Sequence, residues 1–254
     1  MSLAGVAVVT GGSTGIGLAV ARRLAERGAR CVLLGRREER LRAAAAEFDG
    51  EYEVCDVADR EAVGRAAATV LERHPAIGLL VNNAGIAGRR GGFVDMTAER
   101  IEELMRINYL GSVWCARAFL PGLEAADDAK VVNVVSVAGS VALGPYSASK
   151  HAQLAFSRSL CRELRPRGIH VLTVSPGFAV TEGFPQDHLL EGPFRRLVME
   201  PDDVARRIMR ALDRGRTEIF VPGWYRPAAW MQAAAPGLLT RTVSLGRVRP
   251  GRYR

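Results

Sequence analysis

Short apolar runs alternate with longer segments of helical periodicity along most of the chain. Two of the runs, residues 6–10 (VAVVT) and 30–34 (RCVLL), are typical in length. Continuous apolar strands of about five residues, each followed by a helix, indicate a parallel sheet covered on both faces. The pattern therefore predicts an α/β fold with three layers. We expect a doubly wound, Rossmann-like architecture with a parallel sheet of about seven strands.

The expected elements follow in a regular strand–helix order. Strands are expected at residues 6–10, 30–34, 52–57, 77–81, 131–136, 169–175 and 218–221. Helices are expected at residues 16–27, 38–48, 60–73, 98–120, 146–164 and 201–212. No internal repeat or long linker interrupts them, so residues 1–254 are expected to form one domain. Residues 223–254 form a C-terminal appendage with aromatic residues first and a basic tail last.

The formal net charge of +8 raises the question of a nucleic-acid partner. Almost all the basic residues are arginines, since Lys130 and Lys150 are the two lysines of the chain. The arginines are scattered along the expected helices, and no zinc-finger, RNP or helix-turn-helix pattern accompanies them. A solvated, arginine-rich surface is therefore favoured, and no nucleic-acid partner is expected. With lysine so scarce, Lys150 is not ordinary surface charge.

Cysteine and histidine usage argues against metal and disulfide chemistry. The four cysteines are far apart and form no C-x-x-C pair, which predicts reduced thiols in the core. The four histidines do not cluster, so neither a metal site nor a Ser-His-Asp triad is expected. The first residues lack a basic leader, and no apolar run reaches the roughly 18 residues of a membrane span. We expect a cytoplasmic protein.

A glycine-rich loop, T-G-G-S-T-G-I-G, lies between the first expected strand and helix. Glycines at positions 11, 15 and 17 permit a tight turn and a close approach of backbone to a pyrophosphate. The following helix offers free N–H groups and a favourable dipole to phosphate. The position at the start of an α/β alternation favours a dinucleotide site over a glycine turn without a ligand.

Tyr146 and Lys150 are four residues apart in an expected helix. They would share one face, with Cβ atoms about 5–6 Å apart. A free tyrosine has a pKa of about 10, and a neighbouring ammonium lowers it by stabilising the phenolate. Tyr146 could then exchange a proton with a carbonyl or alcohol oxygen near neutral pH. The alternative is an ordinary surface pair.

These motifs occur in an order that resembles the short-chain dehydrogenases/reductases. The fingerprint T-G-x-x-x-G-x-G is followed by D-V at 56–57, N-N-A-G at 82–85, Asn108, Ser136, Y-S-A-S-K at 146–150 and P-G-F-A-V-T at 176–181. The resemblance covers about residues 3–221. It implies an NAD(P)-dependent oxidoreductase acting on CH–OH groups.

The resemblance also implies roles for individual residues. The catalytic set would be Tyr146, Lys150, Ser136, which binds the substrate oxygen, and Asn108, which positions a water beside the lysine. The cofactor would be bound by Gly11, Ser13, Thr14, Gly15, Ile16, Gly17, Arg36, Arg37, Asp56, Val57, Asn82, Ala84, Gly85, Tyr146, Lys150, Pro176, Gly177 and Thr181.

Four of these residues have structural alternatives. Asp56 could cap the next helix, and Asn82 could be a structural amide bonded to neighbouring backbone. Ser136 could only terminate its strand, and Asn108 could be an ordinary amide packed between helices.

The end of the second strand favours NADP over NAD. An NAD enzyme would place a carboxylate there for the ribose hydroxyls. The sequence instead reads Gly35-Arg36-Arg37, with no acid until Glu38. A guanidinium can pair with a 2′-phosphate in bidentate fashion, whereas a carboxylate would repel it. Against this, many NADP-dependent members carry a base where this chain has Thr14, and solvated arginines remain the alternative.

The spacing between Ser136 and Tyr146 departs from the resemblance. It is ten residues, and members of the family have a longer connection, by about one turn. The connecting loop runs beside the substrate pocket, so we expect altered access and an imperfectly placed serine. Ser140 is a poorer substitute because it is still closer to the tyrosine.

By the same resemblance, residues 178–199 correspond to a variable substrate lid, and their apolar character fits a hydrophobic carbonyl or alcohol. The main hypothesis is an NADP(H)-dependent reductase or dehydrogenase that forms a homodimer or homotetramer. The alternatives are a catalytically weak NADP(H)-binding sensor or scaffold, and a basic binder of nucleic acid or membrane surfaces. The aromatic appendage could lie on a membrane, cover the pocket or form a subunit contact; membrane contact is a minority interpretation.

Overall fold

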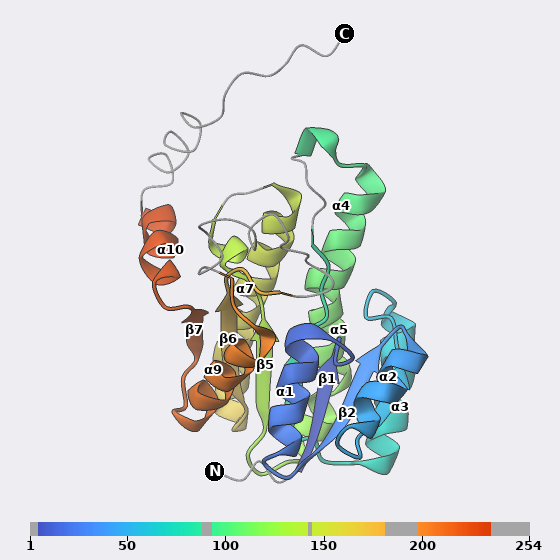
Figure 1. The fold of residues 1–254 in the computed structure, drawn as a ribbon. Helices are drawn as coiled ribbons and strands as arrows, with labels where there is room; N and C mark the ends of the chain where they lie inside the picture. Colours follow the sequence, from blue (N-terminus) through green and yellow to red (C-terminus); the bar gives the residue numbers. More distant parts are fainter. Residues whose placement is uncertain (1–4, 88–92, 142–143, 181–197, 235–254) are drawn as a thin grey trace.

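The computed structural model describes residues 5–87, 93–141, 144–180 and 198–234 (Figure 1). Seven parallel strands form one sheet in the order β3-β2-β1-β4-β5-β6-β7. The strands are β1 (Gly5–Thr10), β2 (Ala29–Gly35), β3 (Glu51–Val54), β4 (Leu79–Asn82), β5 (Lys130–Val134), β6 (His170–Pro176) and β7 (Glu218–Val221). The strand order reverses between β1 and β4, which is where doubly wound sheets open a ligand crevice. The predicted Rossmann-like fold is therefore confirmed.

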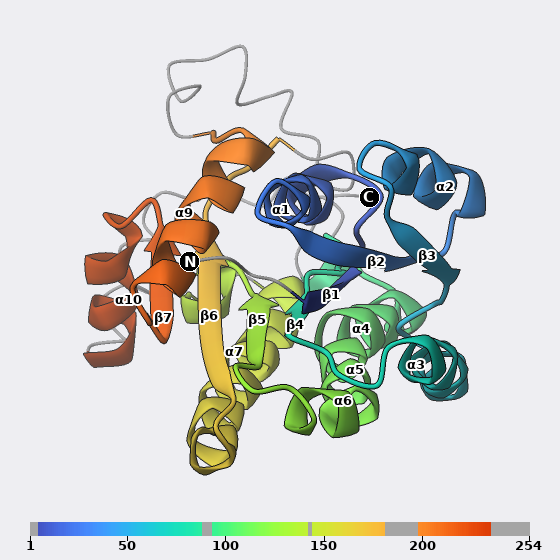
Figure 2. The ribbon, with the colours of Figure 1, turned by 90° about the horizontal axis from the view of Figure 1, so that it is seen from below.

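Helices cover both faces of the sheet (Figure 2). One layer contains α1 (Gly15–Ala25), α2 (Glu38–Ala46) and α9 (Pro201–Asp213). The other contains α3 (Arg60–Arg73), α4 (Ala98–Met105), α5 (Gly111–Ala118), α6 (Leu120–Glu124) and α7 (Pro145–Leu164). Short helical turns lie at η1 (Phe93–Asp95), η2 (Arg106–Leu110), η3 (Val137–Ser140) and η4 (Arg165–Arg167), and α10 (Tyr225–Ala234) lies beside β7.

The alternation of side chains along each strand produces two cores. On β1, Ala7 and Val9 face the layer of α1, α2 and α9, whereas Val8 faces the opposite layer. Each of these side chains is at most 1% exposed. Because helices cover both faces of the sheet, a polar side chain on either face would cost free energy. This explains why the strands are continuous apolar runs in the sequence.

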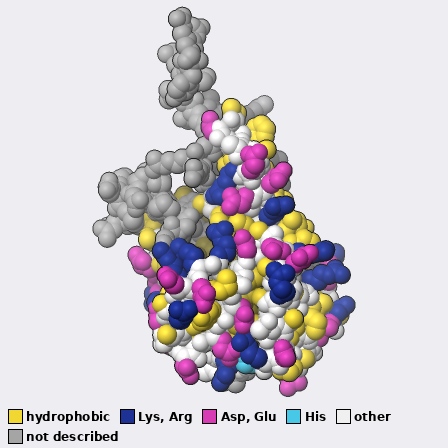
Figure 3. Space-filling view, turned by 90° about the vertical axis from the view of Figure 1, so that its right-hand side faces the viewer, with side chains coloured by type: hydrophobic (Ala, Val, Ile, Leu, Met, Phe, Trp, Pro, Cys, Tyr) yellow, Lys and Arg dark blue, Asp and Glu magenta, His cyan; other side chains and the backbone are white. Residues whose placement is uncertain are grey.

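Several of the scattered arginines form ion pairs between neighbouring elements. Arg23 pairs with Asp202 and Arg27 with Asp213, each at 2.8 Å, and these pairs join α1 to α9. In Figure 3 basic and acidic side chains are intermixed on the face shown. That face presents no single-sign patch of the kind that nucleic acid requires.

The long helix expected at residues 98–120 is interrupted twice. The π-helical turn η2 separates α4 from α5, and α5 ends at Ala118. The second break has a local cause: Pro121 has no N–H to donate to the carbonyl of Arg117, so the chain starts α6 instead.

Two further features of the fold differ from the expectations, namely the end of β3 and the presence of α10. The third strand was expected to reach Val57, but β3 ends at Val54, because Asp56 turns the chain by accepting a hydrogen bond from Ala58 N. Helix α10 is not among the elements expected from the sequence. Pro227 lies in its first turn, where a backbone N–H has no helical partner, so it does not prevent the helix. Among the described helices, none is long and apolar enough to cross a membrane.

A row of buried polar side chains runs through the layer between the sheet and α7. Asn82, Asn133 and Thr173 occupy matched positions on β4, β5 and β6. Asn82 Nδ2 donates to Asn133 Oδ1 (2.9 Å), Asn133 Nδ2 donates to Ser157 Oγ (2.9 Å), and Ser157 Oγ lies 2.7 Å from Thr173 Oγ1. All four are at most 1% exposed. Buried polar groups are costly to leave unpaired, so the bonds of Asn133 and Thr173 to Ser157 fix the position of α7 on the sheet.

Replacing the middle of this row is expected to cost more than replacing its end. Asn133→Val removes two hydrogen bonds and leaves Asn82 Nδ2 without its acceptor, and it should lower the free energy of unfolding by about 2–4 kcal/mol. Thr173→Val, a nearly isosteric control, removes one hydrogen bond and should cost about 1–2 kcal/mol. Urea unfolding of both variants measures the difference. Equal costs would contradict the account.

Candidate active site

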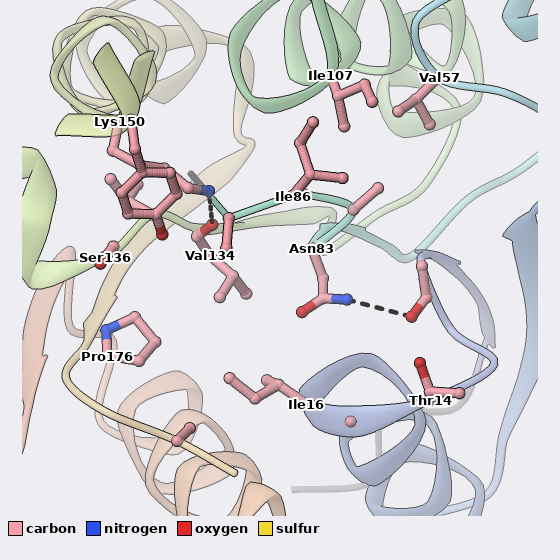
Figure 4. Close-up of a pocket in the computed structure, with 18 of the residues that line it drawn as sticks. Thr14, Ile16, Val57, Asn83, Ile86, Ile107, Val134, Ser136, Lys150 and Pro176 are labelled. Carbon is pink, nitrogen blue, oxygen red and sulfur yellow. Dashed lines mark hydrogen bonds between the residues drawn. The ribbon is translucent and has the colours of Figure 1, made fainter. Parts of the chain in front are cut away.

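One cavity of about 620 Å³ lies at the carboxyl ends of the strands (Figure 4). Most of the expected site residues line it: Gly11, Ser13, Thr14, Gly15, Ile16, Arg36, Arg37, Asp56, Val57, Ala84, Gly85, Ser136, Tyr146, Lys150, Pro176 and Gly177. In Figure 4, Thr14 and Asn83 lie toward one side of the cavity, and Ser136 and Lys150 toward the other. Residues that sequence analysis assigned to nucleotide binding and to catalysis thus share one space.

The loop between β1 and α1 takes a shape that its glycines make possible. Gly11 and Gly15 have φ of +63° and +56°, a conformation that other residues adopt only with strain. A Cβ on Gly17 would lie 2.3 Å from Gly11 O, so this glycine permits the helix to pack under the loop rather than lining the cavity. Helix α1 begins without a side-chain cap and without an acidic residue in its first turn. Its first N–H groups are therefore suited to the phosphates of a dinucleotide.

Thr10 and Asn83 join this loop to the segment after β4. The hydroxyl of Thr10 accepts hydrogen bonds from Asn83 N and Ala84 N, both at 3.0 Å. In return, Asn83 Nδ2 donates to Thr10 O (3.1 Å) and Gly11 O (3.3 Å). The two halves of the crevice are fixed to each other by these bonds before any ligand binds.

Three expected residues do not line the cavity, and one lies outside the described residues. Asn82 points into the layer beneath α7, as its alternative role as a structural amide anticipated, although its partner is the side chain of Asn133. Gly17 and Asn108 are packed behind the wall. Thr181 belongs to residues 181–197, which the structure does not describe.

Arg36, Arg37 and Asp56 line the cavity where β2 and β3 end. Arg36 and Asp56 form a long ion pair of 3.9 Å, and the Arg36 side chain is 58% exposed. Asp56 Oδ1 accepts from Ala58 N, whereas the cap of α3 is Asp59, which accepts from Glu61 N and Ala62 N. Asp56 therefore shapes its own turn and does not cap the helix.

Tyr146 and Ser136 meet at the other side of the cavity. Burial raises the pKa of the Tyr146 phenol, and its hydrogen bond with Ser136 lowers it. The Ser136 hydroxyl also accepts from Ala138 N at 3.1 Å, which begins the turn η3. The serine is thus beside the tyrosine despite the ten-residue spacing, and the expected misplacement is not seen.

The loop that follows Ser136 is fastened closely to α7. Ser147, which is 2% exposed, donates to the carbonyls of Ala138 and Val141. A Cβ on Gly139 would lie 2.8 Å from Lys150 O, so only a glycine allows this approach without displacement. These contacts compensate for the short connection by holding η3 directly on the helix.

Lys150 is 4% exposed, and burial lowers the pKa of its ammonium to about 7. Its Nζ donates to Gln153 Oε1 (2.8 Å) and Val134 O (3.4 Å), the second of which is drawn in Figure 4. A Cβ on Gly85 would lie 3.4 Å from Nζ. Near neutral pH, the ammonium of Lys150 in the free protein therefore loses its proton more readily than that of an exposed lysine.

Asn108 lies in the π-helical turn η2 and is fully buried. Its Oδ1 accepts from Ile86 N (2.8 Å), and its Nδ2 donates to Ile86 O and Ser149 Oγ, both at 3.0 Å. The side chain thus connects the segment after β4 to α7, next to Lys150, as the alternative of a packed amide anticipated, and its role in positioning a water stays a prediction.

The cavity wall around Ser136 and Pro176 is largely apolar, with side chains from Val137, Ala138, Val141, Phe178 and Ala179. The two ends of the expected lid are joined, since Met199 N donates to Phe178 O (2.9 Å) and Val180 N to Met199 O (3.0 Å). Most of that lid lies outside the described residues. From the appendage, Tyr225 packs against Gly177, where an added Cβ would lie 2.3 Å from its ring.

Sequence reasoning missed several lining residues, including Cys55, Asn83, Ile86, Ile107 and Val134. Asn83 could in principle have been predicted as a lining residue from the sequence. Neighbouring residues at a strand end point to opposite sides, and Asn82 aligns with a second asparagine in the next strand. The apolar ones had no distinguishing signal, because they look like any other core residue.

A dinucleotide-phosphate loop and a Tyr–Lys pair at one cavity of a doubly wound sheet define a Rossmann-fold oxidoreductase. The family model for short chain dehydrogenases matches residues 5–188. The chain belongs to this family, and it is an NAD(P)-dependent short-chain dehydrogenase/reductase.

Individual relatives agree with this assignment. Dehydrogenase/reductase SDR family member 4 of Mus musculus is 34% identical over 216 residues, which cover 79% of this chain and 77% of the relative. A variant of the actinorhodin polyketide ketoreductase with NADPH is 28% identical, with a TM-score of 0.78, and covers 88% of this chain and 97% of its own. A metagenomic short-chain oxidoreductase in complex with NADP is 33% identical, with a TM-score of 0.72, and covers 87% and 98%.

Two helical glycines provide a matched test of the phosphate loop. Gly17→Ala forces a Cβ into Gly11 O, and overpacking of this kind costs about 1–3 kcal/mol. We expect NADPH affinity to fall about 10–100-fold. Gly64→Ala, on the exposed side of α3 with nothing within 4 Å, should bind normally and be slightly more stable. Fluorescence titration with NADPH measures the difference, and equal affinities would refute the packing role of Gly17.

Proposed function

We propose that the protein is an NADP(H)-dependent oxidoreductase that interconverts a hydrophobic carbonyl compound and its secondary alcohol. The observation that carries the proposal is the meeting of Tyr146, Ser136 and Lys150 in the cavity that also holds the glycine loop. Proton transfer to the substrate oxygen in such a reaction requires a proton donor, a hydroxyl that binds the oxygen and a buried cation.

The chain supplies the proton and the binding of the reacting oxygen. A bound nicotinamide supplies or accepts the hydride. Ser136 donates a hydrogen bond to the substrate oxygen and stabilises the charge that develops there. Tyr146 gives its phenolic proton to that oxygen in reduction, or accepts the proton from the alcohol in oxidation. The Lys150 ammonium favours the phenolate form and so opposes the increase in pKa that burial causes.

The preference for NADP rests on Arg36 and Arg37 at the cavity rim. Arg36 makes only a long contact with Asp56 among the described residues, so its guanidinium retains donors for a second anion. No carboxylate lies at the end of β2 itself, since the strand ends at Gly35. The NADP(H)-containing structures of the metagenomic oxidoreductase and the actinorhodin ketoreductase support this choice.

The apolar wall beside Ser136 supports a hydrophobic substrate. Its side chains are apolar apart from Ser136 and Tyr146, so a hydrophobic carbonyl compound would lose little hydration that the site does not replace. The alternative of a catalytically weak sensor was motivated by the short serine–tyrosine spacing. With Ser136 beside Tyr146, that motivation is gone. Homo-oligomer formation and a cytoplasmic location remain predictions.

Tyr146→Phe tests the proposed reaction. Removing the phenolic hydroxyl should lower kcat by about 10²–10⁴-fold, which is the usual contribution of general acid catalysis. NADPH affinity should persist, because the aromatic ring is retained. Steady-state turnover of a panel of hydrophobic ketones, together with NADPH titration, measures both. A variant that keeps most of its activity would refute the assignment. A wild-type protein that binds NADPH tightly but turns over no carbonyl would favour the sensor.

Arg36→Asp tests the choice of cofactor. Losing a hydrogen-bonded charge pair and adding a repulsive carboxylate should raise KM for NADPH about 10–100-fold. KM for NADH should change little. Arg42→Asp is a control on the neighbouring helix α2, where Arg42 pairs with Glu38 away from the cavity. Equal effects of Arg36→Asp on both cofactors would count against a 2′-phosphate contact.

A further inference from the structure

The ammonium of Lys150 has no acidic partner in the described part of the chain. Its two hydrogen-bond acceptors are neutral oxygens, and the shorter bond goes to Gln153 Oε1 at 2.8 Å. A buried cation is costly unless its donors are satisfied, and here a glutamine one turn further along α7 satisfies one of them. Gln153 is not needed by the proposed reaction, yet it contacts a residue that is.

The direction of the Gln153 amide is fixed by a second contact. Gln153 is 0% exposed, and its Nε2 donates to Ser112 Oγ at 2.8 Å. The Lys150 ammonium can only donate, so it requires the amide oxygen, and the amide nitrogen at the other end then donates to the Ser112 hydroxyl, which holds the amide in this orientation. Ser112 is itself 4% exposed and belongs to α5. All three polar groups are therefore buried inside the protein.

Two matched contacts between α5, its preceding turn η2 and α7 bracket the lysine. Asn108 bonds to Ser149, and Ser112 bonds to Gln153. Asn108 and Ser112 are four residues apart, as are Ser149 and Gln153, so each pair lies on one helix face. Lys150 follows Ser149 directly. The position of its side chain is thus determined by both contacts, but only the second one touches the ammonium.

We propose that Gln153 is a positioning residue for Lys150. Its amide oxygen, held in place by Ser112, directs the ammonium toward the cavity and stabilises the protonated state that Tyr146 requires. The inference rests on the proposed function only for the pairing of Lys150 with Tyr146.

The surroundings of Lys150 contain few groups that could produce the same effect. Tyr146 is the titratable side chain beside it on α7, and His151 is exposed and bonds to Ser147 O. The neighbouring segments contribute the uncharged Val134 carbonyl and, near Gly85, the Asn108 amide. Burial alone lowers the lysine pKa to about 7. Losing the nearest acceptor should lower it further, because the ammonium gains more from that bond than the neutral amine does.

The pKa of Lys150 can be measured directly, since the chain has only two lysines. In protein labelled with [¹³Cε]lysine, the signal missing from Lys150→Met identifies Lys150, and a pH titration gives its pKa. Gln153→Leu should lower that pKa by about one unit. Gln153→Glu should raise it by about 1–3 units, because a carboxylate at this distance favours the ammonium.

Two substitutions of Ser112 provide a matched pair of controls at a residue that contacts Gln153 and not the ammonium. Ser112→Ala frees the amide and should lower the lysine pKa in the same direction as Gln153→Leu, by a smaller amount. Ser112→Thr retains the hydroxyl and should restore the wild-type value. If Gln153→Leu fails to fold, Gln153→Glu and Ser112→Ala still predict shifts in opposite directions. An unchanged Lys150 pKa in the folded variants would overturn the proposal and leave Gln153 a packing residue.

Kinetics provide the second measurement. Carbonyl reduction needs protonated Lys150, so the rate is lost as pH rises through the lysine pKa. Gln153→Leu should move this alkaline limb of kcat to lower pH with little change in substrate KM, and Gln153→Glu should move it to higher pH. A loss of rate with an unmoved limb would overturn the proposal. If the wild-type protein reduces no carbonyl, the proposed function fails, while the NMR titration still decides the role of Gln153.

Discussion

The packing of helix α7 against the sheet is the contact on which the site depends. This helix carries Tyr146 and Lys150, and it buries an unusual number of polar groups, among them Ser147, Gln153 and Ser157. Apolar burial is not directional and would allow the helix to slide or rotate slightly. Hydrogen bonds between buried groups are directional and costly to break, so they fix the helix in one position. The catalytic pair inherits its geometry from these bonds.

The charges around the cavity are arranged for a ligand with negative groups. At one side the uncapped start of α1 and the arginines after β2 attract phosphate. At the other side the buried lysine lacks a carboxylate among the described residues, so its charge is available to a phenolate or alkoxide. A carboxylate beside Lys150 would make the ammonium harder to deprotonate, but its negative charge would cancel the positive charge that the lysine offers to a phenolate or alkoxide. A neutral amide stabilises the ammonium without cancelling its charge.

The sequence was sufficient to predict the doubly wound fold class and more than half of the residues that line the cavity. Both depend on local signals: apolar periodicity, glycines before a helix, and residues four apart. The assignment failed where the answer depends on partners distant in sequence. Asn82 and Asn83 are distinguishable only by the register with Asn133, and the role of Gln153 depends on Ser112, 41 residues earlier. The π-helical turn at Asn108 likewise arises from tertiary contacts, because helical propensity alone favours an uninterrupted helix.

The short connection between Ser136 and Tyr146 shows why spacing along the chain is an incomplete guide to a site. The reaction needs a hydroxyl beside a phenol. The residues between Ser136 and Tyr146 only have to be numerous enough to span the distance between the two. In the described part of this connection, Ala138 and Val141 accept hydrogen bonds from Ser147 of α7, and Gly139 lies directly against the helix. A loop bound so closely leaves more of the pocket wall to other segments. Tyr225 of α10, packed on Gly177, shows that the appendage reaches that wall. The segment after β7 therefore supports the pocket wall from behind Gly177.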